Sequence, residues 1–145
     1  MAKLIAGLCF AAICMVYANR KSTLCKLKLG FISEILAFLR MCKEMIRYLR
    51  TEVGGILRIA ANKYPNLKFI KDGNFTNCFG YECEIKDFME RIGSSDLNGQ
   101  IDLCQRYLDF FENEYVANKE ELQKQAKTYK ALGLFGAAAI IVIFI

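Results

Sequence analysis

Apolar residues recur every three or four positions through much of the chain, which is the spacing of amphipathic helices. The clearest run predicts one long helix with an apolar face made of Leu29, Ile32, Ile35, Leu36, Leu39, Met45, Ile46 and Leu49. We expect Gly54-Gly55 to break this helix. The spacing then predicts shorter helices over 56–60, 66–71 and 82–91, the last with Cys83, Phe88 and Ile92 facing inward.

The second half of the chain carries the usual signals for a helix end followed by a helix start. Gly93 is a typical residue to close a helix, and Ser94, Ser95 and Asp96 are typical residues to cap the next one. That next helix shows apolar residues near heptad spacing at Leu97, Ile101, Cys104, Leu108 and Phe111. With only one proline in 145 residues, the pattern predicts an all-α fold built as a helical bundle.

The two ends of the chain are uncharged and apolar. Leu4 to Ala18 and Ala131 to Ile145 are each fifteen residues without a charge, somewhat shorter than the roughly 20 residues that a spanning helix usually needs. We expect both to be transmembrane helices, which divides the chain into 1–19, 20–130 and 131–145. A cleaved signal peptide at the first end and a buried core helix at either end are the alternatives.

Basic residues flank both apolar ends on the side of the central segment. Arg20 and Lys21 follow the first end, and Lys130 precedes the second. The positive-inside rule therefore predicts a cytoplasmic central domain. Gly133 and Gly136 give the second end a small-residue face on which another helix can pack closely.

Charge is distributed unevenly along the central segment. Residues 20–50 contain eight basic and two acidic side chains, whereas residues 82–121 contain eleven acidic and four basic ones. Two interpretations are open: solvated helix faces that attract each other, or docking surfaces for different partners. Nucleic-acid binding is not expected, because the acidic face offsets the basic one.

The sequence offers little for catalysis. It has no histidine, which removes the commonest general base and metal ligand, and it has no glycine-rich phosphate loop. The seven cysteines include no two short-spaced pairs of the kind a structural zinc site needs, so we expect them to be buried small residues. We predict no enzyme activity, no cofactor, no metal and no small-molecule substrate. A membrane-tethered enzyme or metal protein using these cysteines is a minor alternative.

Three motifs resemble those of the stage III sporulation protein AB family of endospore-forming bacteria. Ile92-Gly93-Ser94-Ser95-Asp96, followed by Gln100, is similar to the family's Leu-Gly-x-x-Asp-x-x-x-Gln. Thr51-Glu52-Val53 resembles its Thr-Glu-Ile, and residues 127–136 (KTYKALGLFG) resemble its Lys-x-Tyr-x-x-Leu-Gly-x-x-Gly. The chain departs from the family at Gly54-Gly55, where a proline-containing step is common.

The resemblance implies a role rather than a reaction. It implies a non-catalytic scaffold of the channel complex between mother cell and forespore, required after engulfment. The expected location is the mother-cell membrane around the forespore, and the expected partners are other membrane proteins of that channel and a cytoplasmic ATPase. A platform-type scaffold of a type II secretion or type IV pilus system, whose cytoplasmic domain is similar, is the alternative. The signature residues, expected to be structural or docking residues, are Glu52, Gly93, Asp96, Gln100, Gly133 and Gly136.

Overall fold

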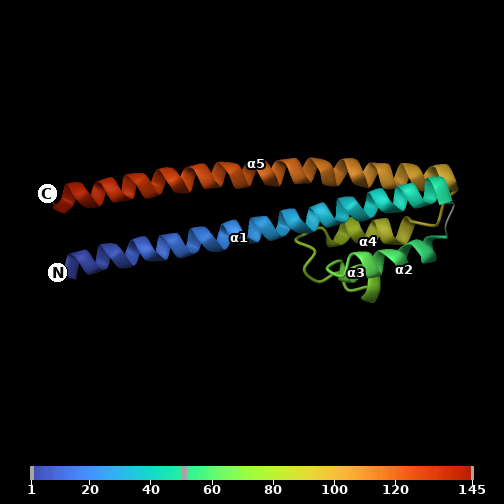
Figure 1. Ribbon diagram of the computed structural model, residues 1–145, viewed down its shortest axis with the longest axis horizontal. Helices are drawn as coiled ribbons and strands as arrows, with labels where there is room; N and C mark the ends of the chain where they lie inside the picture. Colours follow the sequence, from blue (N-terminus) through green and yellow to red (C-terminus); the bar gives the residue numbers. More distant parts are fainter. Residues whose placement is uncertain (1, 50–51, 145) are drawn as a thin grey trace. The chain divides into compact units, whose positions relative to one another are not determined.

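A computed structural model describes the backbone of residues 2–49 and 52–144, and the side chains of residues 16, 20, 22–49, 52–128 and 131. Within these residues every regular element is a helix and none is a strand (Figure 1), which confirms the all-α prediction. In chain order the elements are α1 (Ala2–Glu44), the π-helix η1 (Met45–Leu49), α2 (Val53–Lys63), α3 (Lys68–Asp72), α4 (Glu82–Arg91) and α5 (Leu97–Phe144).

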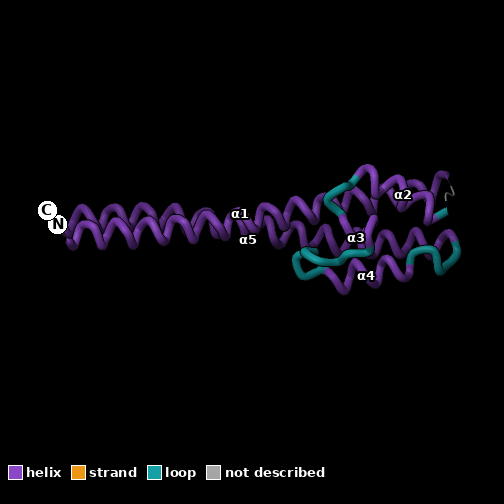
Figure 2. The backbone as a smooth tube through the Cα atoms, turned by 90° about the horizontal axis from the view of Figure 1, so that it is seen from below, coloured by secondary structure: helices purple, strands orange, loops and turns teal. Residues whose placement is uncertain are grey.

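The chain forms two compact units. The central unit is Lys28–Val116, and the terminal unit combines Met1–Leu27 with Ala117–Ile145. In the terminal unit the first part of α1 and the last part of α5 run alongside each other, with Ala2 and Phe144 at the same end (Figures 1 and 2). The division 1–19, 20–130 and 131–145 predicted from the sequence stays a prediction.

Membrane spans receive no support from the described part of the chain. None of the helices there has a stretch long and apolar enough to cross a membrane. The two predicted spans, residues 4–18 and 131–145, lie outside the residues with described side chains, apart from Val16 and Ala131. The predicted spans therefore stay predictions as well.

The core of the central unit is built around Phe38 of α1. Its ring meets those of Tyr64, Phe69 and Phe88 edge-on, with centroids 6.5, 6.2 and 6.1 Å away. One α1 side chain therefore contacts residues from both sides of the central unit. Figure 2 shows α2 and α4 on opposite sides of it. The predicted apolar face of the long helix is buried at Ile32, Ile35, Leu36, Leu39 and Ile46.

The break after the long helix lies earlier than predicted. Gly54 and Gly55 belong to α2, and the prediction that they interrupt a helix is wrong. The α-helix instead gives way to the π-helix η1 at Met45. A π-helix has a wider turn than an α-helix, so Leu49 no longer follows the buried face and is 67% exposed.

Cys83 also differs from its predicted position. It is exposed, and the inward face of α4 is formed by Ile85 and Phe88, continued at its two ends by Tyr81 and Ile92. These four residues follow the three- and four-residue spacing of one helix face. Cys83 lies two residues before Ile85 and therefore points away from that face.

Candidate docking site at the α4–α5 junction

Gly93 lies directly beyond the end of α4 and is constrained in two ways. Its φ of +88° belongs to the left-handed region, which glycine adopts without steric cost. A Cβ at this position would lie 3.2 Å from Cγ2 of Val53 at the start of α2. Gly93 therefore allows the chain both to turn and to approach α2 closely.

Asp96 caps the start of α5. Its Oδ1 accepts a hydrogen bond from the Gly99 backbone N–H at 3.0 Å, and its carbonyl accepts one from the Gln100 N–H at 3.0 Å. An N-cap aspartate satisfies backbone donors that the helix leaves unpaired, and its charge favours the positive end of the helix dipole. Among the three capping candidates of the sequence, the aspartate makes this contact with α5.

Gln100 and Gly99 both contact Ser95 and Asp96, the two residues that follow Ser94. The Gln100 side-chain Nε2 donates to the Ser95 carbonyl at 2.8 Å. A Cβ on Gly99 would lie 2.8 Å from both Asp96 Oδ1 and Ser95 Oγ, too close for any other residue without a shift. Gly99 is thus part of the junction, although only its spacing after the capping residues would have indicated it in the sequence.

Glu52 opens α2 on the other side of this contact. Its carbonyl accepts hydrogen bonds from the backbone N–H groups of Gly55 at 2.9 Å and Ile56 at 3.1 Å, while its side chain makes no capping bond and is exposed. Because Val53 packs against Gly93, Glu52-Val53 and the Gly-x-x-Asp motif meet in space. We define the junction as residues 52–53 and 92–100.

Exposed apolar side chains lie on the segments that lead into the junction. Tyr48 and Leu49, at the end of η1, are 69% and 67% exposed, and Leu97, the first residue of α5, is 39% exposed. Figure 1 shows the end of α1 and the start of α5 at the same end of the central unit. These three exposed apolar side chains are the candidates for a protein contact at the junction.

The last two signature residues cannot be placed in this way. Gly133 and Gly136 fall in α5, but they lie outside the residues whose surroundings the structure describes. Their predicted role as a helix-packing face stays a prediction.

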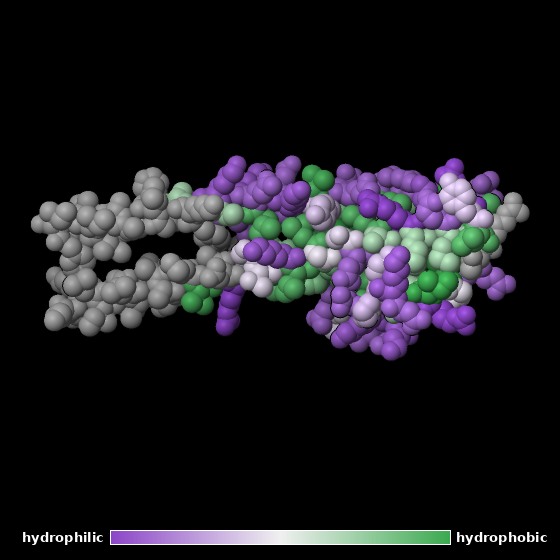
Figure 3. Space-filling view, viewed as in Figure 1, coloured by the Kyte–Doolittle hydropathy of each residue, from purple (hydrophilic) through white to green (hydrophobic). Residues whose placement is uncertain are grey.

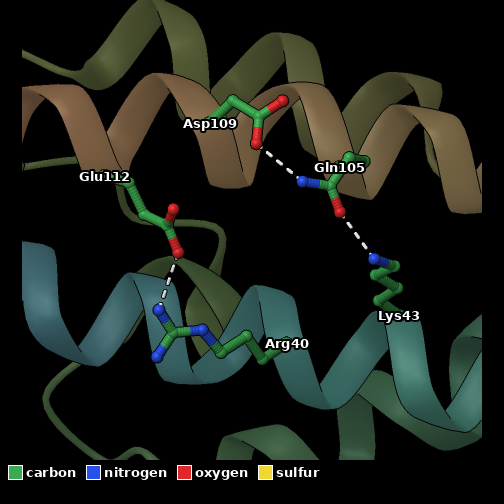
Figure 4. A network of polar contacts seen from close by, with 5 residues as sticks. All are labelled: Arg40, Lys43, Gln105, Asp109 and Glu112. Atoms are coloured by element: carbon green, nitrogen blue, oxygen red, sulfur yellow. Dashed lines mark hydrogen bonds and ion pairs between the residues drawn. The ribbon is translucent and has the colours of Figure 1, made fainter.

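Polar contacts along the α1–α5 seam connect the basic and acidic segments noted in the sequence. Arg40 donates to Glu112 at 2.7 Å, and Lys43 donates to Gln105 at 2.5 Å, which in turn donates to Asp109 at 2.6 Å (Figure 4). The Arg40 and Glu112 side chains are 60% and 50% exposed, so water screens this ion pair. Here the two charged segments attract each other, as the first interpretation of the charge pattern expects.

Asp87 of α4 is linked to α5 by a charge-assisted hydrogen bond. The Tyr107 hydroxyl donates to its carboxylate, and Arg91 donates to the same carboxylate at 3.3 Å. The Tyr107 bond, followed by the Arg91 contact, holds the pKa of Asp87 below its ordinary value of 3.8. Burial of the ring and the bond to Asp87 raise the pKa of Tyr107 from 10.0 to about 12.

Three cysteines of the central unit are buried as predicted. Cys42, Cys78 and Cys104 are each at most 2% exposed, and burial raises the pKa of the Cys104 thiol to about 11. Such thiols are weak nucleophiles near neutral pH. No three histidine, cysteine or acidic side chains cluster closely enough to hold a metal within the described residues.

Residues 92–100 of the junction fall inside a segment that is similar to a known family. Residues 82–145 match the family model of stage III sporulation protein AB. The resemblance inferred from the sequence is thereby confirmed over this segment, which includes Gly93, Asp96, Gln100, Gly133 and Gly136. A search of curated proteins and one of solved structures found no match to the chain.

This segment resembles a family that is named for stage III of sporulation. It begins with α4 and contains the whole of α5, so Glu52 and Val53 lie outside it. The close approach of Val53 to Gly93 nevertheless joins them to it in space. The junction is therefore the place where the family segment meets the first half of the chain.

Proposed function

We propose that this protein is a non-catalytic membrane scaffold of the channel complex between mother cell and forespore, acting after engulfment. The family match of residues 82–145 carries the proposal. The junction supports it, because Asp96 and Gln100 satisfy backbone groups of the α5 start rather than converging on a space where a substrate would react. Polar side chains used in this way hold the backbone in a fixed conformation, which suits a scaffold.

The same proposal assigns the protein to the mother-cell membrane around the forespore. The uncharged ends would anchor the chain, and the basic residues that flank them would keep the central unit in the cytoplasm. Its partners would be other membrane proteins of the channel and a cytoplasmic ATPase. The junction, which contains the exposed Leu97 and follows the exposed Tyr48 and Leu49 in the sequence, is the surface that we assign to these contacts.

Deletion of the gene in its spore-forming host tests the proposed role. The expected phenotype is arrest after engulfment, with a loss of heat-resistant spores that the full chain restores when it is supplied in trans. A deletion strain that makes heat-resistant spores at the normal level would contradict the proposal.

Surface variants then test the junction itself. Leu97→Ser removes an exposed apolar side chain at the junction, and Val116→Ser removes one that is 54% exposed elsewhere on α5. Neither is buried, so both variants are expected to fold. We expect Leu97→Ser combined with Tyr48→Ser to lower spore counts and Val116→Ser to leave them unchanged, with chain levels checked by immunoblot. Equal spore counts for all variants would remove the junction as the docking surface.

A further inference from the structure

Helices α2 and α3 carry four basic residues and a single acidic one, Asp72 at the end of α3. Between Val53 and Lys71 there is no acidic residue. The four basic side chains of this stretch are all exposed: Arg58, Lys63, Lys68 and Lys71. We call these four residues the basic surface. They lie outside the segment that matches the family model.

Among the described residues the four cations of the basic surface have no carboxylate within 4.0 Å, although Glu34 of α1 accepts a hydrogen bond from Asn66 and Asp72 ends α3. Arg40, Lys86 and Arg91 each lie within 4.0 Å of a carboxylate oxygen. In the part of the chain that the structure describes, none of the four residues of the basic surface has such an ion pair, and Lys63 only lies 5.6 Å from the ring centroid of Tyr64. These four side chains are therefore exposed cations without an ion pair in the described part of the chain.

The helices that carry these cations are packed against the core of the central unit. Ile56 and Ala60 of α2 and Phe69 of α3 are at most 3% exposed. Because these side chains are buried, the opposite face of each helix points toward solvent. Ile59, 45% exposed, lies between Arg58 and Lys63 in the sequence and adds an apolar contact point. Figure 3 shows hydrophilic side chains gathered over α2 and α3 with a hydrophobic patch beside them. Exposed charges beside an exposed apolar side chain are compatible with the polar rim of a protein contact.

The same chain carries a complementary surface on the other flank. Residues 82–116 contain nine acidic and three basic side chains, and Glu90, Asp102 and Asp109 are exposed. Figure 2 shows α2 and α4 on opposite flanks of the central unit. Among the described residues no ion pair joins 53–71 to 82–116. One copy therefore cannot bring its own two surfaces together.

We propose that the basic surface of one copy binds the acidic surface of α4 and α5 on a second copy. Complementary potentials of this kind steer association and fix its orientation. Because the two surfaces differ, the contact is head-to-tail and repeats, giving a ring where the rotation closes and an open chain where it does not. The contact does not depend on the sporulation role, since it rests on charges outside and inside the family segment alike.

Zero-length carbodiimide crosslinking of the full chain tests the contact directly. Unlabelled and ¹⁵N-labelled chains are mixed in a nonionic detergent at low salt, treated with the carbodiimide and digested for mass spectrometry. We expect amide crosslinks between Lys63, Lys68 or Lys71 of one isotopic form and carboxylates of residues 82–116 of the other. Absence of such mixed crosslinks overturns the proposal, because the reagent joins amines only to carboxylates in direct contact.

Charge reversal provides a matched pair of variants. The triple change Lys63→Glu, Lys68→Glu and Lys71→Glu reverses most of the basic surface, while Lys119→Glu, Lys124→Glu and Lys127→Glu makes the same charge change at exposed positions of α5. Sedimentation velocity of the full chain in the same detergent measures association. We expect the first triple to weaken it about tenfold or more through like-charge repulsion, and the second to leave it unchanged.

Mixing restores the contact if the two surfaces are true partners. A chain with Glu90→Lys and Asp102→Lys is expected to associate poorly alone but to form pairs with the Lys63, Lys68, Lys71 triple variant. About 0.5 M salt should weaken the wild-type contact, since it screens exposed charges. Equal weakening by both lysine triples, or no restoration on mixing, overturns the proposal.

Discussion

Gly93 is the residue at which backbone conformation and packing both exclude a side chain. Replacing it with alanine places a Cβ at a φ of +88° and 3.2 Å from Val53 Cγ2. We expect Gly93→Ala to lower the free energy of unfolding by about 2 kcal/mol, from left-handed strain and the contact together. Urea denaturation of the full chain, followed by circular dichroism, measures the change.

Gly80 separates the two causes. It has a φ of +91°, and a Cβ there would have nothing within 4 Å. Gly80→Ala is therefore expected to show the cost of the backbone alone, about 1 kcal/mol, and less than Gly93→Ala. If the two variants lose the same stability, the Val53 contact contributes nothing.

Asp96 makes its contribution through one capping bond to the Gly99 N–H at 3.0 Å. Asp96→Ala is expected to cost about 1 kcal/mol of unfolding free energy, the usual value for a lost N-cap. Asp96→Asn keeps an acceptor oxygen and should retain most of that stability. Thermal unfolding of the two variants tests this, and equal losses would mean that the side chain does not act as a cap.

At the level of elements, α4 and α5 are joined by a contact that depends on pH. The hydrogen bond from Tyr107 lowers the pKa of Asp87 below 3.8 in the folded protein. The ionised carboxylate therefore adds stability that is fully present above pH 3.8 and is lost as the pH falls through the lowered value. On the alkaline side, the pKa of Tyr107 is raised from 10.0 to about 12 in the folded protein. The protonated hydroxyl therefore adds stability that is fully present below pH 10 and is lost as the pH rises from 10 to about 12.

Tyr107→Phe removes the hydrogen bond to Asp87. The variant's stability should therefore depend less on pH than that of the wild type, both in acid and in alkali. We expect its unfolding midpoint in urea to change less than that of the wild type when the pH falls from about 5 to about 2, and again when it rises above 10. Tyr115→Phe is the control, because its hydroxyl makes no hydrogen bond within the described residues. Parallel profiles for the wild type and Tyr107→Phe would rule out the coupling.

The elements that the sequence predicted well are those with a clear apolar period. Ile32, Ile35 and Leu39 are buried as their spacing requires, and the Gly93 and Asp96 signals lie where one helix ends and the next begins. The sequence predicts these features because each signal and the structure that it causes lie within a few residues of each other. Contacts between residues far apart in the sequence are harder to predict. Nothing near Val53 in the sequence indicates that it packs against Gly93.

The π-helix η1 shows a different limit. The run Met45, Ile46 and Leu49 fits an α-helical face, and only the change to a wider turn exposes Leu49. The basic surface has another physical reason for being hard to predict. The sequence shows the cations Arg58, Lys63, Lys68 and Lys71, but only the structure shows which cations of the chain have an ion-pair partner.

At the scale of the whole molecule, the proposed membrane anchoring raises the question of which side of the membrane the central unit occupies. Cysteine labelling answers it, because Cys83 is exposed while Cys42 and Cys104 are fully buried. A thiol reagent that cannot cross membranes is added to intact cells, and mass spectrometry of the peptides then gives the modified positions. If the central unit is cytoplasmic, Cys83 stays unmodified in intact cells and reacts once the membrane is permeabilised. Cys42 and Cys104 should react only after denaturation, since burial shields them and raises the pKa of both thiols. Modification of Cys83 in intact cells would place the central unit on the opposite side and exclude docking to a cytoplasmic ATPase.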